Sequence, residues 1–276
     1  MRKLACAIVI LAILSCGLLL HDGVHATYVY SQAITGNTTW TIQNSPYFLQ
    51  GNVVVNNGIT LTIQPGVTVN FDGYQLTIAG TLKAQGSIGM VIVFSSSGSS
   101  NQRIDFTPTS TSSIVDTALI YSVPIIINGR YTQLSNNYFA NTSMTPITVN
   151  NGSSSIQNNA INFQSCNGVQ INGESVSILN NLIKGQGQNY GIYTQSLAII
   201  SNNNITNCFS GIYAVTQSTV QRNNVMYNTN DGIRSDNSAS LIQNNAIAIT
   251  YVGLVELATL KTTQSRVILW GFGDPI

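Results

Sequence analysis

The chain contains few charged residues. Asp, Glu, Lys and Arg make up 7% of its 276 residues, whereas an average globular domain contains about 25%. The formal net charge at pH 7 is +1. A surface basic enough to hold nucleic acid, or to attach to an anionic membrane by charge, is therefore excluded. The composition predicts neutral partners.

Histidine is nearly absent, and its position matters. Both histidines, His21 and His25, lie within the first 26 residues. If that segment is removed, the mature chain has no His general base, no Ser-His-Asp triad and no His-ligated metal. The sequence therefore predicts no metal site.

The first 26 residues have the pattern of an export signal. Arg2 and Lys3 precede an apolar run over residues 4–20, and small residues lead up to Ala26. We interpret residues 1–26 as a signal peptide, and the protein as secreted or exposed at the cell surface. An uncleaved membrane anchor and lipid attachment at Cys16 are the alternatives. No membrane contact is expected beyond this segment.

A short pattern recurs about every 22 residues through the second half of the chain. It reads apolar-x-Asn-Asn-x-apolar, followed by Gly-apolar. The second asparagine of each copy is Asn137, Asn159, Asn181, Asn203, Asn223 or Asn245, at spacings of 22, 22, 22, 20 and 22 residues. A period this short leaves no room for two helices and a turn.

The segments within each repeat are short, rich in Ile and Val, and alternate apolar with polar residues, which is strand behaviour. The sequence therefore predicts an all-β fold, a right-handed parallel β-helix with rungs of about 22 residues. The leucine-rich repeat is the runner-up fold, but its repeating leucines are missing here.

In a β-helix, equivalent residues of successive rungs stack on one another, at a spacing of about 4.8 Å. The six asparagines above would then form an internal ladder whose amides donate to one rung and accept from the other. The following glycines, such as Gly191 and Gly211, would occupy corners where a Cβ would clash. Cys166 and Cys208 would lie two rungs apart, too far for a disulfide. We expect both to be free and to face inward.

The mature chain, residues 27–276, reads as one solenoid. Opening rungs are expected over about residues 45–94, and an exposed Ser/Thr-rich excursion over residues 95–113. The Asn-Asn/Gly repeats follow over about residues 134–254. Residues 255–276 form a tail without an Asn pair, which is either a divergent cap or the result of truncation.

The Asn-Asn/Gly-Ile repeats, together with SPYFLQGNVVV and TLTIQPGVTVNF near the start, resemble the right-handed parallel β-helix proteins of the pectate-lyase-like superfamily. The resemblance implies a carbohydrate partner, either a polysaccharide or a cell-surface glycan. It does not imply one activity, because this superfamily includes lyases, hydrolases, epimerases and adhesins.

One outer face of the predicted solenoid offers candidate carbohydrate-binding residues. In the strand after each glycine, two positions point outward by alternation. The first position holds Gln170, Tyr193, Tyr213 and Arg234, and the second holds Asn172, Gln195, Val215 and Asp236. Tyrosines beside amides and a guanidinium can stack on sugar rings and bond to hydroxyls. Tyrosines also favour any β surface, so a purely structural role is the alternative.

The densest group of charges in the repeats is Arg222, Asp231, Arg234 and Asp236. Lyases of the resembled superfamily use carboxylate-bound Ca²⁺ with an Arg or Lys base, so this group is the candidate catalytic cluster under an enzymatic hypothesis. Otherwise no cofactor is expected. A solvated salt bridge is the simpler interpretation.

Three functional hypotheses follow. The first is an exported, non-enzymatic β-helix module that binds carbohydrate or provides a rigid surface. The second is a polysaccharide lyase or epimerase that acts at the Arg/Asp cluster. The third is a stalk or shell component with no ligand.

Overall fold

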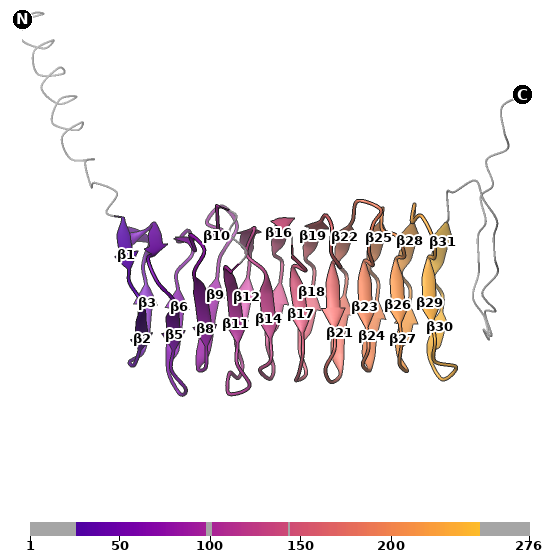
Figure 1. The fold of residues 1–276 in the computed structure, drawn as a ribbon, viewed down its shortest axis with the longest axis horizontal. Coiled ribbons are helices and arrows are strands. Elements are labelled where there is room, and N and C mark those ends of the chain that lie inside the picture. The colour runs from indigo at the N-terminus through magenta and orange to yellow at the C-terminus, as the bar shows by residue number, and fades with distance from the viewer. Residues whose placement is uncertain (1–25, 98–100, 143, 249–276) are drawn as a thin grey trace, which may run out of the picture.

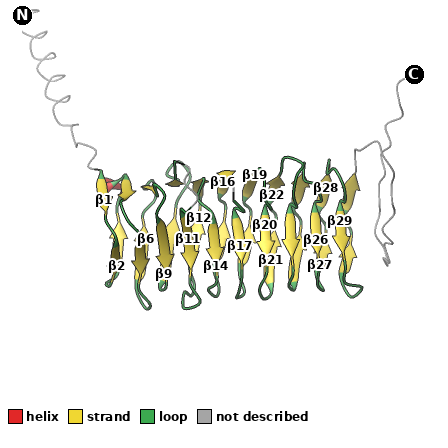
Figure 2. Cartoon of the chain, viewed as in Figure 1, coloured by secondary structure: helices red, strands yellow, loops and turns green. Residues whose placement is uncertain are grey.

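The computed structural model describes residues 26–97, 101–142 and 144–248. These residues form a parallel β-solenoid whose coils lie side by side along one long axis (Figure 1). Each coil contributes three short strands joined by turns, and the one helical element of the described residues is the short 3-10 helix η1 (Ile42–Asn44) (Figure 2). The predicted all-β parallel solenoid is confirmed.

The strands stack into three parallel sheets, which we name A, B and C. Sheet A consists of β1 (Thr27–Val29), β4 (Tyr47–Leu49), β7 (Thr68–Asn70), β10 (Ile92–Ser95), β13 (Ala118–Tyr121), β16 (Tyr138–Thr142), β19 (Ala160–Phe163), β22 (Leu182–Lys184), β25 (Asn204–Thr206), β28 (Asn224–Met226) and β31 (Ala246–Ala248). Sheet B consists of β2 (Gln32–Ile34), β5 (Val53–Val55), β8 (Gln75–Ile78), β11 (Arg103–Phe106), β14 (Ile125–Ile127), β17 (Ile147–Val149), β20 (Val169–Ile171), β23 (Ile192–Thr194), β26 (Ile212–Ala214) and β29 (Ile233–Ser235). Sheet C consists of β3 (Thr38–Trp40), β6 (Thr60–Ile63), β9 (Thr81–Gln85), β12 (Ile114–Asp116), β15 (Gln133–Ser135), β18 (Ser155–Gln157), β21 (Val176–Leu179), β24 (Ala198–Ser201), β27 (Thr219–Gln221) and β30 (Leu241–Gln243).

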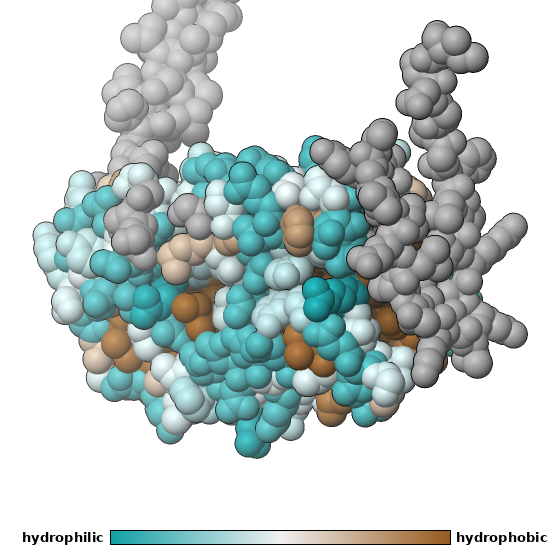
Figure 3. Space-filling view, turned by 45° about the vertical axis from the view of Figure 1, so that its right-hand side comes forward, coloured by the Kyte–Doolittle hydropathy of each residue, from teal (hydrophilic) through white to brown (hydrophobic). Residues whose placement is uncertain are grey.

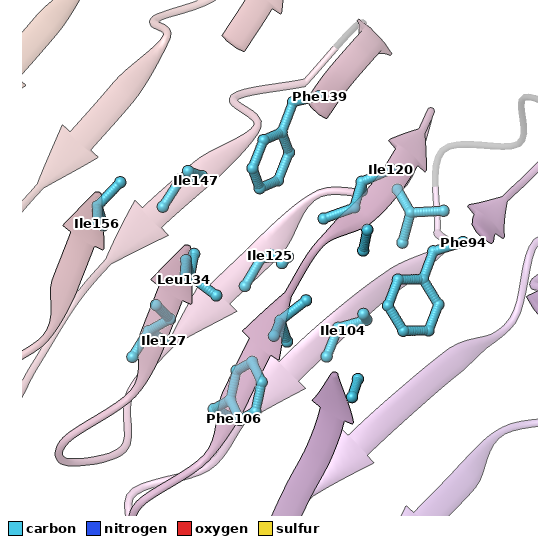
Figure 4. Close-up of a cluster of buried hydrophobic side chains, with 14 of the residues drawn as sticks. Phe94, Ile104, Phe106, Ile120, Ile125, Ile127, Leu134, Phe139, Ile147 and Ile156 are labelled. Atoms are coloured by element: carbon cyan, nitrogen blue, oxygen red, sulfur yellow. The ribbon is translucent and has the colours of Figure 1, made fainter. Parts of the chain in front are cut away.

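Successive coils stack in register, so equivalent side chains lie directly above one another. Ile156 of β18, for example, pairs with Leu134 of β15 and with Ile178 of β21. Apolar side chains alternate inward along each strand and fill the solenoid from end to end; Figure 4 shows Phe94, Ile104 and their neighbours in this core. Burying each such side chain contributes roughly 1.5–3 kcal/mol. This continuous core is what holds the short strands together.

The asparagine ladder lies at the corner between sheets C and A, and all six of its members are buried. Asn181 shows the bonding pattern. Its Oδ1 accepts the backbone N–H of Asn159 at 2.9 Å and the Nδ2 of Asn159 at 3.0 Å. Its Nδ2 donates to the carbonyl of Ile156 at 2.9 Å and to Oδ1 of Asn203 at 3.0 Å. The ladder thus satisfies backbone groups that the corner buries, and the predicted role of these residues is confirmed.

The first asparagine of each pair has a different role, which the sequence did not reveal. Asn136, Asn158 and Asn180 have φ values of 55°, 55° and 57°. This left-handed region is costly for most residues and is tolerated best by Gly and Asn. Arg222 takes the same position with φ 56°, so its place in the fold is a corner of the coil.

The glycines of the repeat are needed for space and not for a special backbone angle. A Cβ on Gly211 would lie 2.2 Å from Cγ1 of Val225 and 2.6 Å from the carbonyl oxygen of Gly232. These contacts are far closer than van der Waals separation. The predicted corner role is therefore confirmed, with close packing as its cause.

The solenoid begins earlier than the sequence suggested. Its first coil starts at Thr27 with β1, β2 and β3, and not at about residue 45. Each of these three strands has three residues and buries one side chain, Val29, Ile34 or Trp40. A strand with a single inward residue shows no alternation, so the sequence pattern did not reveal it.

The interpretation of residues 95–113 as an exposed excursion is wrong for most of its length. Arg103–Phe106 form β11 in the middle of sheet B, where Ile104 and Phe106 are fully buried. Ser110 and Ser113 are also buried and hydrogen-bond to each other at 3.2 Å. Paired hydroxyls make Ser compatible with an interior corner, so Ser/Thr content alone was misleading.

Other sequence predictions fall partly outside the described residues. The signal segment up to residue 25, the end of the last predicted repeat and the tail 255–276 all lie outside the described residues. Within the described residues, no helix is long and apolar enough to span a bilayer. Cys166 and Cys208 are both free, as predicted. Burial raises the pKa of the Cys208 thiol to about 12.

The ladder generates a stability prediction. Replacing Asn181 by Ala removes the acceptor for the backbone N–H of Asn159 and the donor to the carbonyl of Ile156. Because both groups stay buried, Asn181→Ala should lower the free energy of unfolding by about 2–5 kcal/mol. Urea denaturation followed by circular dichroism measures this change.

The matched control is the neighbouring, exposed Asn180. Asn180→Gly keeps the left-handed corner and should change stability by no more than roughly 0.5 kcal/mol. An Asn181→Ala protein as stable as Asn180→Gly would show that the ladder bonds contribute nothing.

Candidate functional site

The structure brings the predicted outward column together on sheet B. Gln170 pairs with Tyr193, Tyr193 with Tyr213, and Tyr213 with Arg234, each in the next strand. These side chains lie on the solvent side of β20, β23, β26 and β29, whose inward neighbours fill the core. Four consecutive coils thus present one continuous line of polar and aromatic groups.

Two further aromatic residues join this line, and the sequence analysis missed both. Tyr190 stacks on Tyr193 with ring centroids 5.5 Å apart, and its ring lies 5.2 Å from that of Tyr213. Phe209 meets Tyr190 edge-on at 6.4 Å. Tyr193 and Tyr213 are themselves 5.4 Å apart. Tyr190 is therefore the centre of a four-ring group.

Tyr190 and Phe209 both lie in turns that lead from sheet A to sheet B. Turn residues do not follow the strand alternation, which is why a strand-based analysis overlooked them. One signal was available: ten residues separate Asn181 from Gly191, against eight between Asn203 and Gly211. The longer turn supplies Tyr190.

A charged group adjoins the rings at the C-terminal side of the line. Nε of Arg234 lies 3.2 Å from Oδ1 of Asp236, and its guanidinium carbon is 4.6 Å from the centre of the Tyr213 ring. The Tyr213 hydroxyl donates to Oδ2 of Asp236. These contacts hold the Tyr213 ring and the guanidinium in fixed positions, and the cation–π contact adds to them.

The contacts move the pKa of each of these three ionisable groups further from neutral pH. The hydrogen bond to Asp236 raises the pKa of Arg234 and also raises the pKa of Tyr213. The hydrogen bond from Tyr213 lowers the pKa of Asp236. A general acid or base works best with a pKa near the working pH. None of these three groups is adjusted for proton transfer near pH 7.

The proposed Arg/Asp cluster does not come together as one site. Arg222 is exposed at the corner between sheets C and A, and within the described residues it makes no ion pair. Asp231 accepts from Nδ2 of Asn230 at 3.0 Å and from Oγ of Ser210 at 3.4 Å. Asp231 affects Arg234 only through a weaker charge effect. In the described part of the chain, no three acidic, Cys or His side chains gather where a metal ion could be held.

The second outward column carries a line of side-chain amides. Asn172 donates to Asn150 at 2.9 Å, Asn150 to Asn128 at 3.1 Å, and Asn128 to Asp105 at 3.1 Å. Gln170 donates to Asn172 at 3.1 Å. Each amide uses one donor and one acceptor in the line, so others remain for solvent or ligand.

Gln195 continues this column beside the rings. Its Nε2 donates to the Tyr193 hydroxyl at 2.7 Å. The amide line and the aromatic group are therefore adjacent parts of one outer face of sheet B.

Comparison with known proteins supports the same fold. A family model described as a right-handed β-helix region matches residues 124–260. Together with the parallel solenoid seen in the structure, this match identifies the chain as a right-handed parallel β-helix protein, and the resemblance to the pectate-lyase-like superfamily is consistent with this. Comparisons with curated proteins and with solved structures gave no match.

The pKa directions predict how the Tyr213–Asp236–Arg234 group responds to pH. The folded pKa of Asp236 lies below its unfolded value. Its stabilising contribution is thus fully present above the unfolded pKa of about 3.9 and is lost as the pH falls through the folded pKa. The tyrosine signal in near-ultraviolet circular dichroism should stay constant from about pH 5 to pH 9 and change only below about pH 4.

Asp236→Asn is the control for this titration, because it cannot ionise. The variant should lack that acid transition, since its bond from Tyr213 no longer depends on a carboxylate. A wild-type transition centred above about pH 5 would contradict the assigned contacts.

Proposed function

We propose that the chain is an exported, non-enzymatic β-helix module that binds carbohydrate on the outer face of sheet B. The observation that carries this proposal is the solvent-facing group of Tyr190, Tyr193 and Tyr213, beside Gln195 and the Arg234–Asp236 pair. Export rests on the pattern of residues 1–26 alone.

The arrangement suits sugar rings for physical reasons. A sugar has apolar C–H faces that stack on aromatic rings and hydroxyls that bond to amides and charged groups. The three rings contact one another, and two of them, Tyr193 and Tyr213, are mounted on strands packed against the core, so little motion is lost on binding. Such preorganisation lowers the entropic cost of binding.

A lyase or epimerase is the second candidate, and the same contacts disfavour it. Arg234 would have to lose a proton to act as a base, but its pairing with Asp236 raises its pKa. Arg222, the other candidate base, is at a different corner of the coil. A purely structural role is the third candidate, in which the rings only stabilise the surface.

Glycan binding can be tested by affinity chromatography on a panel of neutral and acidic polysaccharides. Tyr193→Ala removes one of the three stacked rings and should weaken retention by roughly 2- to 10-fold, since stacking contacts of this kind contribute about 0.5–1.5 kcal/mol. Tyr213→Phe keeps the ring but loses the bond to Asp236, and should weaken retention less.

Tyr121→Ala is the matched control, because Tyr121 is an exposed strand tyrosine on sheet A. It should bind as the wild type does. Equal retention of all variants, or no retention of wild type, would overturn the proposal.

Measuring polymer size in the same experiment, with and without Ca²⁺, distinguishes an enzyme that cleaves the polysaccharide from a module that only binds it. Shortened polymer that disappears in Arg234→Ala would favour a lyase. Intact polymer retained by the wild type is the expected result.

A further inference from the structure

Charge is distributed unevenly among the three faces of the solenoid. In the described residues, the strands of sheet A contain a single charged side chain, Lys184. Strands of sheet B carry Arg103, Asp105 and Arg234, and those of sheet C carry Lys83 and Asp116. Sheet A is therefore the face with least charge.

An apolar column runs along the outside of sheet A. Its members are Val93, Leu119, Tyr138, Ala160 and Leu182, and each pairs in register with the next. Tyr138 and Leu182 are 44% and 48% exposed. Four coil steps of about 4.8 Å give the column a length of roughly 19 Å. The space-filling view shows that hydrophobic patches on this molecule stand out from a largely hydrophilic surface (Figure 3).

The apolar character continues at the N-terminal end of the same face. Tyr28, 58% exposed, stacks on Phe48 with ring centroids 5.6 Å apart. At the corner that leads into sheet A, Ile42 and Met90 approach each other over Gly66, and the nearby Ile88 is fully exposed. Residues 26–71, which form the first two coils and the first strand of the third, contain no Asp, Glu, Lys, Arg or His.

Exposed apolar side chains gathered in a column on one face mark an interaction site in soluble proteins, and the Tyr28–Phe48 pair is a second apolar group on that face. The chain itself indicates the partner. The apolar run over residues 4–20 joins the solenoid at β1, the first strand of sheet A. If that run is retained as the uncleaved membrane anchor and inserts in a bilayer, sheet A begins at the membrane surface. Tyrosine is enriched at the boundary between lipid and water, and the lack of carboxylates avoids repulsion by lipid headgroups.

We propose that the outer face of sheet A rests on a lipid bilayer, with the column from Val93 to Leu182 and the Tyr28–Phe48 pair in the interfacial region. The solenoid axis would then lie along the membrane. Membrane contact would extend beyond the N-terminal segment, contrary to the expectation from sequence. The glycan face on sheet B is a separate surface, so this proposal stands independently of glycan binding.

The test uses the full chain, with Cys6, Cys16 and Cys166 changed to Ser and the buried Cys208 retained. Single cysteines are introduced at Leu119 on sheet A, Thr148 on sheet B and Ser177 on sheet C, all outward-facing and partly exposed. Each is labelled with an environment-sensitive fluorophore and mixed with phosphatidylcholine vesicles, some carrying nitroxide on the acyl chains. The Leu119→Cys label should shift to the blue and be quenched several-fold more strongly than the other two.

A second variant separates the face from the N-terminal segment, which all three labelled proteins share. Adding Tyr138→Glu and Leu182→Glu should abolish the shift at Leu119→Cys, while circular dichroism shows an intact fold. Equal quenching at all three positions, or a shift that survives the two glutamates, would overturn the proposal. So would a shift that appears without vesicles and grows with protein concentration, because a second copy would then be the partner.

Discussion

From Asn137 to Asn245, the coils depend on one buried amide each. At the corner between sheets C and A, the chain turns inside the solenoid, and a backbone N–H would have no partner there. The ladder asparagine of the next coil accepts it, at 2.9 Å for Asn137, Asn159, Asn181, Asn203 and Asn223 alike. An unpaired N–H at each of these corners would cost about 1–3 kcal/mol. The ladder therefore sets which residues of successive coils must stack.

Because the ladder fixes the corner between sheets C and A, the length of a coil can vary only in its other turns. Asn203 and Asn223 are 20 residues apart instead of 22, yet their bond is 2.9 Å. The turns from sheet A to sheet B and from sheet B to sheet C absorb the differences, and the first of these turns carries Tyr190 and Phe209. The fixed corner between sheets C and A thus leaves the other two turns free to vary and to shape the outer faces. The outer faces of the sheets therefore differ: sheet A has little charge, whereas sheet B combines aromatic rings with side-chain amides.

The period, the strands and the ladder could be predicted because they repeat, and repetition makes a weak signal visible. The first coil could not be predicted, because each of its three-residue strands has only one inward side chain: Val29, Ile34 or Trp40. Strand β11 was hidden by the Ser and Thr around it. The line from Gln170 to Arg234 followed from alternation alone. The position of Tyr190 could not be predicted in this way, because it depends on the geometry of a turn. Arg222 was grouped with Asp231 because the two are near in sequence, although the coil places them at different corners.

The most direct test of the ladder is amide hydrogen exchange in the full chain, resolved by residue. The backbone N–H groups of Asn137, Asn159, Asn181, Asn203 and Asn223 lie at corners, where exchange is ordinarily fast. If their side-chain acceptors hold them, they should exchange as slowly as the N–H groups of the buried strand residues Ile156 and Ile178. Exchange as fast as that of the exposed turn residue Gln188 would contradict the claim that the ladder organises this fold.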